Sequence, residues 1–177
     1  TVVGAGPFEG DTIVAANRIS VVVNPMSLFG DDGFEVTKVI LAEPALHAHK
    51  LADGKVNWDI VKASEEGSSS FSLSIRDFRI SDATIRYEDD STGMRFSTAP
   101  LSLRLRGDMS ADQTDLDLRL TAGAVRLVSG GIPLLSDAEA ELDAVIAADL
   151  KNNRFTFSRN RLRLNAIELT LDGWAEM

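Results

Sequence analysis

The sequence predicts a mainly β protein, built as one curved antiparallel sheet of repeated, bulged strands, groove-like or partly closed, with one or two short helices. One spacing of apolar residues (h), h-x-h-x-x-h-x-h, begins at Phe34, Leu73 and Leu162. Alternation places apolar side chains on one face of a strand, and the doubled polar step would reverse that face unless a bulge absorbs one residue. Leucines also alternate with polar residues through much of the second half. Because no long amphipathic helix is visible to cover such a sheet, we expect a curved sheet with one apolar face.

The N-terminal elements are bounded by residues that favour turns and caps. Asn24 can cap a helical turn that begins at Pro25 and ends at Gly30. Glu43-Pro44 interrupts a strand, and Asp53-Gly54 is a turn signal. The expected elements are a strand at 12–23, a helical turn at 24–30, the first bulged strand at 34–41, an extended stretch at 45–51 and a short capped helix at 57–63.

The serine- and glutamate-containing segment 64–70 predicts a linker between an N-terminal strand and short-helix unit, 1–63, and an antiparallel meander, 71–177. We expect the meander to form one continuous sheet with the first unit. Segment 138–150 has the composition of a helix, but its alternation favours a strand. The expected strands of the meander are 71–80, 83–88, 94–98, 101–105, 116–120, 125–127, 138–150, 155–157 and 162–171.

The first two bulged strands open similar units of roughly forty residues, a length typical of repeat architectures. Each strand presents three to five apolar side chains, and each of these contributes roughly 1.5–3 kcal/mol when buried. The sheet must therefore curl on itself, pair with a second sheet or cover an apolar ligand.

Bulk composition narrows the function classes. The chain has 177 residues and a formal charge of -9, with 27 acidic and 18 basic residues, which argues against nucleic acid and anionic lipid headgroups as partners. It contains no cysteine, which excludes disulfides and thiol catalysis. No apolar run approaches the roughly 20 residues of a membrane-spanning helix. The chain starts at Thr1 and ends at Met177, and we expect it to be a piece of a longer protein.

Several motifs between about Ser20 and Phe96 resemble the AsmA family of bacterial envelope proteins, which share an ancestry with TamB-like proteins. Pro25-Met26-Ser27-Leu28-Phe29 precedes the first bulged strand, and Glu43-Pro44 and Asp53-Gly54-Lys55-Val56-Asn57-Trp58 follow it. Phe78 to Asp89 resembles a second family signature of strand, acidic-small turn and strand. Beyond Phe96 only the pattern of alternating leucines remains.

The resemblance implies a periplasmic fragment whose parent is anchored in the inner membrane of a two-membrane bacterium, touching the membrane through parts absent here. It implies a non-enzymatic module with an apolar β groove for phospholipid transfer or outer-membrane biogenesis, with no catalytic residue, cofactor or metal. The partner is then phospholipid or another acyl-chain ligand. The groove candidates are Leu101, Leu103, Leu105, Leu116, Leu118, Leu120, Phe71, Leu73 and Ile75.

The same leucine face fits the closed core of a structural or protein-interaction module in an envelope scaffold, and the sequence leaves this alternative open. In that case the strand edges would carry the function. The segment 162–171 is the expected exposed edge because it is long, alternates well and lacks proline, so we expect it to support self-association.

The remaining polar constellations favour structural roles. His47 and His49 lie two apart, a spacing that can bind a metal, but without a third ligand a surface pair is expected. Glu88 to Gly93 is rich in oxygen atoms yet lacks the order of a calcium loop, so it predicts a hairpin tip.

The basic and aromatic residues also favour structural roles. Arg104, Arg106 and Arg119 should line the polar face, paired across strands with Asp115 or Asp117. These arginines could also meet phosphate headgroups at a groove rim. Trp58 is expected in the core, whereas the place of Trp174 is left open. Gly4-Ala5-Gly6 lacks the rest of a dinucleotide loop, and Ser68 to Ser70 has no histidine nearby in sequence.

Overall fold

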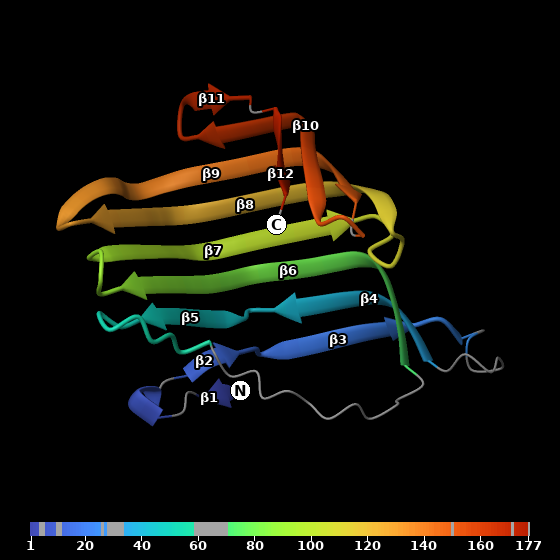
Figure 1. Cartoon of the computed structure of the whole chain (residues 1–177), viewed down its shortest axis with the longest axis horizontal. Helices are drawn as coiled ribbons and strands as arrows, with labels where there is room; N and C mark the ends of the chain where they lie inside the picture. The colour runs from blue at the N-terminus through green and yellow to red at the C-terminus, as the bar shows by residue number, and fades with distance from the viewer. Residues whose placement is uncertain are drawn as a thin grey trace.

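One large β-sheet accounts for nearly all the structure (Figure 1). The computed structural model describes residues 1–3, 6–9, 12–25, 27, 34–58, 71–149, 151–170 and 172–176. These residues form a 12-stranded, mostly antiparallel open sheet, and a short 3₁₀-helix, η1 (Gly6–Phe8), precedes β2. The expected mainly β fold is confirmed.

The strands lengthen towards the middle of the sheet. Several short strands expected from the sequence merge, because the chain bends between them without leaving the sheet. Segment 138–150 is a strand through Asp149, as its alternation predicted. The strands are β1 (Val2–Val3), β2 (Thr12–Ala15), β3 (Arg18–Val23), β4 (Phe34–Ala42), β5 (Ala45–Lys50), β6 (Phe71–Asp89), β7 (Met94–Arg106), β8 (Gln113–Ser129), β9 (Ile132–Asp149), β10 (Arg154–Leu164), β11 (Ile167–Leu169) and β12 (Gly173–Glu176).

The sheet is mixed rather than wholly antiparallel. Strands β6 to β10 form the expected meander, but β4 and β5 both pair with β6 in parallel. This pairing places equivalent positions of the two repeated units side by side: Val39 is opposite Phe78, Leu41 opposite Ile80, and Leu46 opposite Ile85. The repeat and the register therefore agree from Val39 onwards, whereas before the register shift Phe34 lies opposite Phe71 and Val36 opposite Leu73, two residues earlier than the repeat predicts.

The first two bulged strands are irregular where the doubled step predicted it. The registers of β4 with β6 and with β3 both shift beside Thr37. The third bulge is a wrong prediction. Leu164 lies opposite Ile167 and Leu162 opposite Leu169, so the chain turns back at Asn165 into a hairpin. Asn165 has a φ of 51°, a conformation that asparagine tolerates better than most residues.

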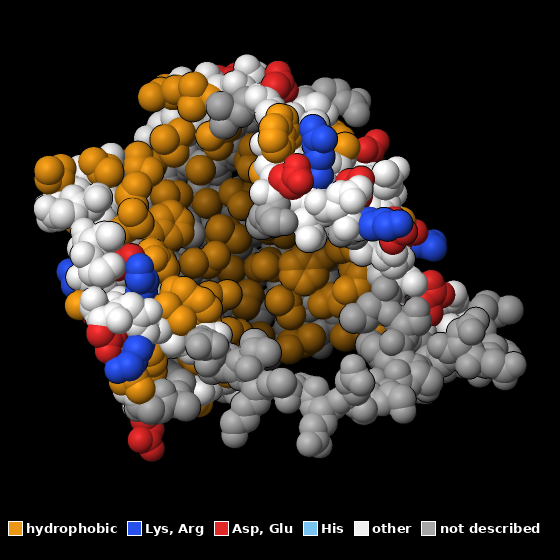
Figure 2. Space-filling model, viewed as in Figure 1, with side chains coloured by type: hydrophobic (Ala, Val, Ile, Leu, Met, Phe, Trp, Pro, Cys, Tyr) orange, Lys and Arg blue, Asp and Glu red, His pale blue; other side chains and the backbone are white. Residues whose placement is uncertain are grey.

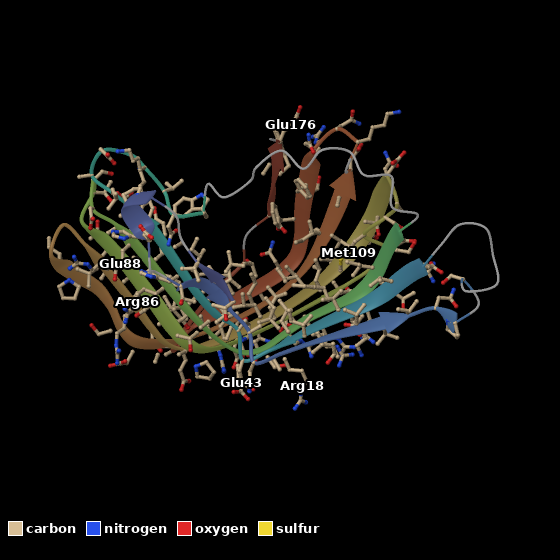
Figure 3. All side chains as sticks on the ribbon, turned by 90° about the horizontal axis from the view of Figure 1, so that it is seen from below. Arg18, Glu43, Arg86, Glu88, Met109 and Glu176 are labelled. Carbon is tan, nitrogen blue, oxygen red and sulfur yellow. The ribbon has the colours of Figure 1, made fainter. Side chains whose placement is uncertain are left out.

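The strands bend at one level across the sheet. Residues with positive φ interrupt successive strands at Glu43 (48°), Asp82 (54°), Ala124 (45°) and Asp137 (53°). The register aligns these interruptions, and β7 carries the cis Ala99-Pro100 bond at the same level. We call this line the crease. It folds the sheet into a trough that runs across the strands, with Glu43 at the outside of the bend (Figure 3).

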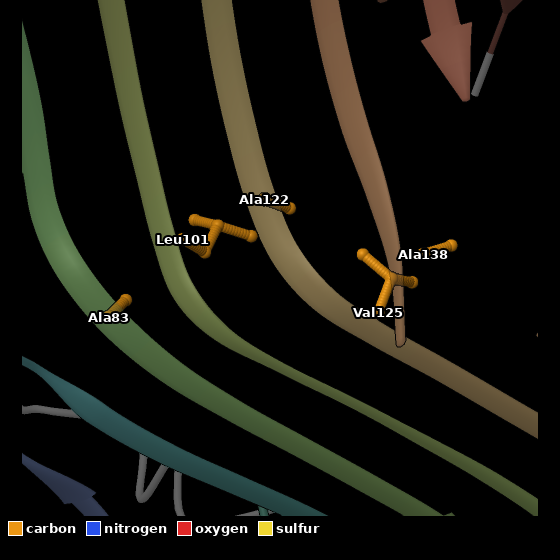
Figure 4. Packing of buried hydrophobic residues seen from close by; sticks show 5 residues of the cluster. All are labelled: Ala83, Leu101, Ala122, Val125 and Ala138. Atoms are coloured by element: carbon orange, nitrogen blue, oxygen red, sulfur yellow. The ribbon is translucent and has the colours of Figure 1, made fainter. Parts of the chain in front are cut away.

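A small cluster of buried hydrophobic residues lies inside the crease (Figure 4). Its members are between 2% and 8% exposed, and three of the five are alanines. Small side chains suit this position because the two walls of the trough converge there. The cluster consists of Ala83, Leu101, Ala122, Val125 and Ala138.

Some predicted elements lie outside the described residues. These are the helix at 57–63 beyond Trp58, the linker at 64–70 and most of the helical turn at 24–30. Within that turn, the Ser27 N–H donates to the Asn24 carbonyl oxygen at 3.1 Å. Of the rejected glycine motif, only Gly6 is described, and the rejected serine run is not.

Candidate apolar groove

The concave face of the trough is a continuous apolar surface. Pairing joins Ile80, Leu103, Leu120, Leu142 and Leu162 into one row across five strands. A parallel row consists of Val39, Phe78, Leu105, Leu118 and Ala144. Figure 2 shows these strands as a hollowed hydrophobic surface framed by polar atoms.

The structure gathers six of the nine groove candidates on this concave face. Two of the six, Leu101 and Leu116, are buried, and the other four are half-buried. The half-buried candidates on this face are Leu103, Leu105, Leu118 and Leu120. Ile75 is also half-buried, and its carbonyl oxygen accepts from the Met109 N–H at 3.0 Å. The side chains of Phe71 and Leu73 lie outside the described residues.

The convex face is charged, and its ions pair both within a strand and across strands. Asp77 on β6 is 2.6 Å from Arg79, 3.1 Å from Arg104 and 3.7 Å from Lys38. The hydrogen bond from Arg79, helped by Arg104, holds the pKa of the Asp77 carboxyl well below its ordinary value. The ion-paired side chains thus lie on the convex face, whereas the two rows of the concave face consist of uncharged side chains.

Cross-strand pairing of the arginines was expected, but the partners of two of them were not. Arg104 pairs with Asp77, and Arg119 pairs with Asp143 at 2.7 Å, rather than with Asp115 or Asp117. Arg106 lies opposite Asp117 in the register, as expected. Alternation along each strand predicted correctly that these arginines lie on the polar face. The partner depends on which strands are neighbours and on their register.

The C-terminal strands close one end of the trough. Strand β10 pairs with β9 along one side, and its other side is shared by β11 and β12. The expected free edge at 162–171 is therefore wrong for Leu162–Leu164, which is paired on both sides, whereas β11 (Ile167–Leu169) pairs only with β10 among the described strands and is an edge of the sheet. The register of β10 with β9 shifts between Ser158 and Arg161, and β12 stands above the floor of the trough (Figures 1 and 3).

An apolar pocket of about 390 Å³ lies between β12 and the floor of the trough. Sequence reasoning missed this pocket. Strand β12 is four residues long and shows no apolar alternation, and its position depends on the bend in β10. The lining residues are Leu118, Leu142, Ala144, Phe157, Asn160, Leu162, Asp172, Gly173 and Trp174.

Both tryptophans are largely exposed, so the expectation that Trp58 is a core anchor is wrong. Trp58 is 42% exposed, with its ring centroid 6.3 Å from that of Tyr87. Trp174 is 62% exposed, and the guanidinium carbon of Arg154 lies 5.0 Å from its ring centroid.

The two histidines form a stacked pair beside the β6–β7 turn. Their ring centroids are 6.0 Å apart, and Nε2 of His49 lies 3.0 Å from Oδ2 of Asp90. Asn57 accepts from the His49 N–H through Oδ1 and donates from Nδ2 to the His47 carbonyl oxygen, both at 2.9 Å. The Asn57 amide thus acts as a strand partner for β5. Among the described residues, no group of three or more His, Asp or Glu side chains is arranged to hold a metal ion.

Residues 88–93 form the expected hairpin tip, although its central carboxylate is buried. Asp89 is 6% exposed and accepts hydrogen bonds from the Ser91 hydroxyl and from the N–H groups of Ser91 and Thr92. These bonds, the Ser91 hydroxyl foremost, lower the Asp89 pKa. The oxygen-rich sequence thus stabilises a turn.

Within the described part of the chain, no helix is long and apolar enough to cross a membrane. Comparison with known proteins adds no relative: no family model, curated protein or solved structure matches the chain.

Proposed function

We propose that this chain is a non-enzymatic section of a bacterial cell-envelope protein of the AsmA type, and that its trough carries acyl chains of phospholipids in the periplasm. The apolar concave face backed by an ion-paired convex face carries the proposal. Apolar contact is non-directional, so aliphatic rows without polar interruptions suit a chain that slides.

The openness of the trough also favours a ligand over a sandwich core. Leu103, Leu105, Leu118 and Leu120 are half-buried, and among the described strands only β12 stands over this face, above Leu118. Covering such side chains is favourable by about 25 cal/mol for each Å² removed from water. An acyl chain lying in the trough would supply that cover. The resemblance of residues 20–96 to the AsmA family adds the cellular setting.

Neighbouring residues on β8 provide a test with an internal control. Leu120 points into the trough, whereas Thr121 is exposed on the next position of the strand. A photo-crosslinking amino acid, benzoylphenylalanine, at position 120 should capture phospholipid in living cells. At position 121 it should capture much less. Equal capture at both positions, or none at either, would refute the proposal.

A second measurement uses no photo-crosslinking amino acid. Native mass spectrometry of protein purified without detergent should detect bound phospholipid. Leu120→Gln should reduce its occupancy severalfold, and Thr121→Gln should leave it unchanged. Protein free of phospholipid, from cells that retain their envelope, would count against the proposal.

One observation favours a protein-interaction module as the second candidate. Among the described residues, β3 pairs only with β4, and Ile19 and Val21 are 64% and 51% exposed. An exposed apolar edge strand is a template for adding a strand from another chain. This candidate predicts binding of protein, with no need for lipid.

A further inference from the structure

We infer that the pocket beneath β12 holds the methyl end of one unbranched acyl chain, with β12 as its outer wall. This inference rests on the proposed function and specifies where one chain ends. It assigns a discrete site at one end of the trough, whereas the proposed function requires only a continuous apolar surface.

The walls of the pocket come from strands that only the bent sheet brings together. Leu118, Leu142 and Ala144 form the floor, on β8 and β9. Phe157 on β10 lies directly opposite Gly173 on β12, so both positions project to the same side of their strand pair. The pocket volume of about 390 Å³ lies within the roughly 300–1,000 Å³ typical of small-molecule sites.

The charges of the lining residues favour the hydrocarbon end of a ligand. Asp172 is the only charged residue among the described residues that line the pocket, and no Lys or Arg is among them. A phosphate or carboxylate headgroup there would lack a cation and lie beside a carboxylate, which is unfavourable in an apolar setting. The headgroup should therefore remain outside, and the uncharged methyl end should enter.

A residue of β12 that lines the pocket provides a reporter. Trp174 lies on β12 next to Gly173, and Arg154 of β10 stacks on its ring. A ligand that fills the pocket should alter the environment of this tryptophan. Since Trp58 is the only other tryptophan, Trp58→Phe leaves Trp174 as the single emitter.

The experiment uses n-alkyl alcohols of increasing length, which are uncharged single chains, and the Trp58→Phe protein. Calorimetry and Trp174 fluorescence measure binding. Each added methylene that enters the pocket should tighten Kd about fourfold, equivalent to about 0.8 kcal/mol. Above one chain length Kd should become constant, because further methylenes remain outside.

Gly173→Leu tests the location. A Cβ built at Gly173 has no heavy atom within 4 Å, so a side chain can start there without a clash, on the side of the strand pair where Phe157 lines the pocket. It should weaken alcohol binding at least tenfold. Ala175→Leu is the matched control, because Ala175 lies on the same strand and face but does not line the pocket. It should change Kd less than twofold, and both variants should unfold cooperatively near the wild-type temperature.

The outcomes separate this inference from the proposed function. If Gly173→Leu binds alcohols as tightly as the wild type while wild-type protein carries phospholipid, the pocket assignment is overturned and the groove remains. If the wild type binds neither alcohols nor phospholipid, both are overturned. A Kd independent of chain length would also overturn the pocket assignment.

Discussion

On the convex face of the sheet, Nη2 of Arg104 lies 3.1 Å from Oδ2 of Asp77 on the neighbouring strand. The same carboxylate accepts hydrogen bonds from Arg79 and lies near Lys38. One acidic side chain thus pairs with three basic side chains from three strands. The outer surface of the central sheet depends on it, because like charges opposite each other destabilise strand pairs.

Replacing Asp77 should test this dependence. Asp77→Asn removes the negative charge, leaves the cations facing one another and should cost about 1.5–3 kcal/mol of unfolding free energy. Urea denaturation measures the change. Asp143→Asn is the control, because the pair that it forms with Arg119 is largely exposed and should contribute less than about 1 kcal/mol. Equal losses in the two variants would contradict the central role of Asp77.

The stability of the protein at low pH should depend on the same carboxylate, Asp77. The pKa of Asp77 is lower in the folded protein than the value of about 3.9 expected for the unfolded chain. Its contribution is therefore complete above that pH and is lost as the pH falls towards the folded pKa. Asp77→Asn should flatten the decline of stability below about pH 4. If the stability of the variant declined at low pH as steeply as that of the wild type, this prediction would be contradicted.

The crease predicts opposite effects for two substitutions at one position. Ala124 has a φ of 45°, which costs a non-glycine residue about 1–2 kcal/mol. Ala124→Gly should therefore raise the unfolding free energy by about 0.5–1 kcal/mol. Ala124→Val should lower it by more than about 1 kcal/mol, because β-branched residues rarely adopt this conformation. Calorimetric unfolding measures both, and changes of the same sign would argue against the crease geometry.

We expect the side chain of Asn57 to stabilise the outer edge of β5 through its hydrogen bonds with the β5 backbone. Asn57→Ala removes two hydrogen bonds from a side chain that is 2% exposed, and we expect a loss of about 2 kcal/mol. Hydrogen exchange at the His49 amide should accelerate, because its acceptor is gone. Asn17→Ala, which removes a single exposed bond of 3.3 Å to Glu43, should have little effect. Unchanged exchange at His49 would show that another group stabilises this edge.

Strand β3 should be the site of self-association in place of the C-terminal segment. Val22→Glu places a negative charge at the edge, and Lys38, which lies opposite position 22, compensates that charge. Sedimentation at several concentrations should show a dimer that Val22→Glu weakens. Thr170→Glu, near the short strand β11, should leave it unchanged. A monomeric wild type at all concentrations would refute the edge assignment.

The sequence was informative wherever the signal was local. Alternation correctly placed Leu103 and Leu120 on one face and Arg104 and Arg119 on the other. It also favoured a strand over a helix for 138–150. The doubled polar step located the irregularity beside Thr37. Each of these features depends on the order of polar and apolar residues within one strand, which the sequence contains in full.

The same doubled step near Asn165 predicted a bulge, but it marks a hairpin. A bulge and a two-residue turn insert similar polar residues between apolar ones. The difference depends on whether the following residues pair with the preceding strand. That pairing is made by Ile167 and Leu169 with β10 and cannot be read from spacing.

By itself, the sequence determined that this protein is a sheet of bulged strands with one apolar and one charged face. Only the tertiary structure decided the parallel pairing of β4 and β5 with β6, the aspartates that pair with Arg104 and Arg119, and the pocket under β12. Face preference is a property of one strand, because successive side chains point to opposite sides. Strand neighbours, register and closure depend on contacts between distant segments, whose free energies become defined only when the whole sheet has formed.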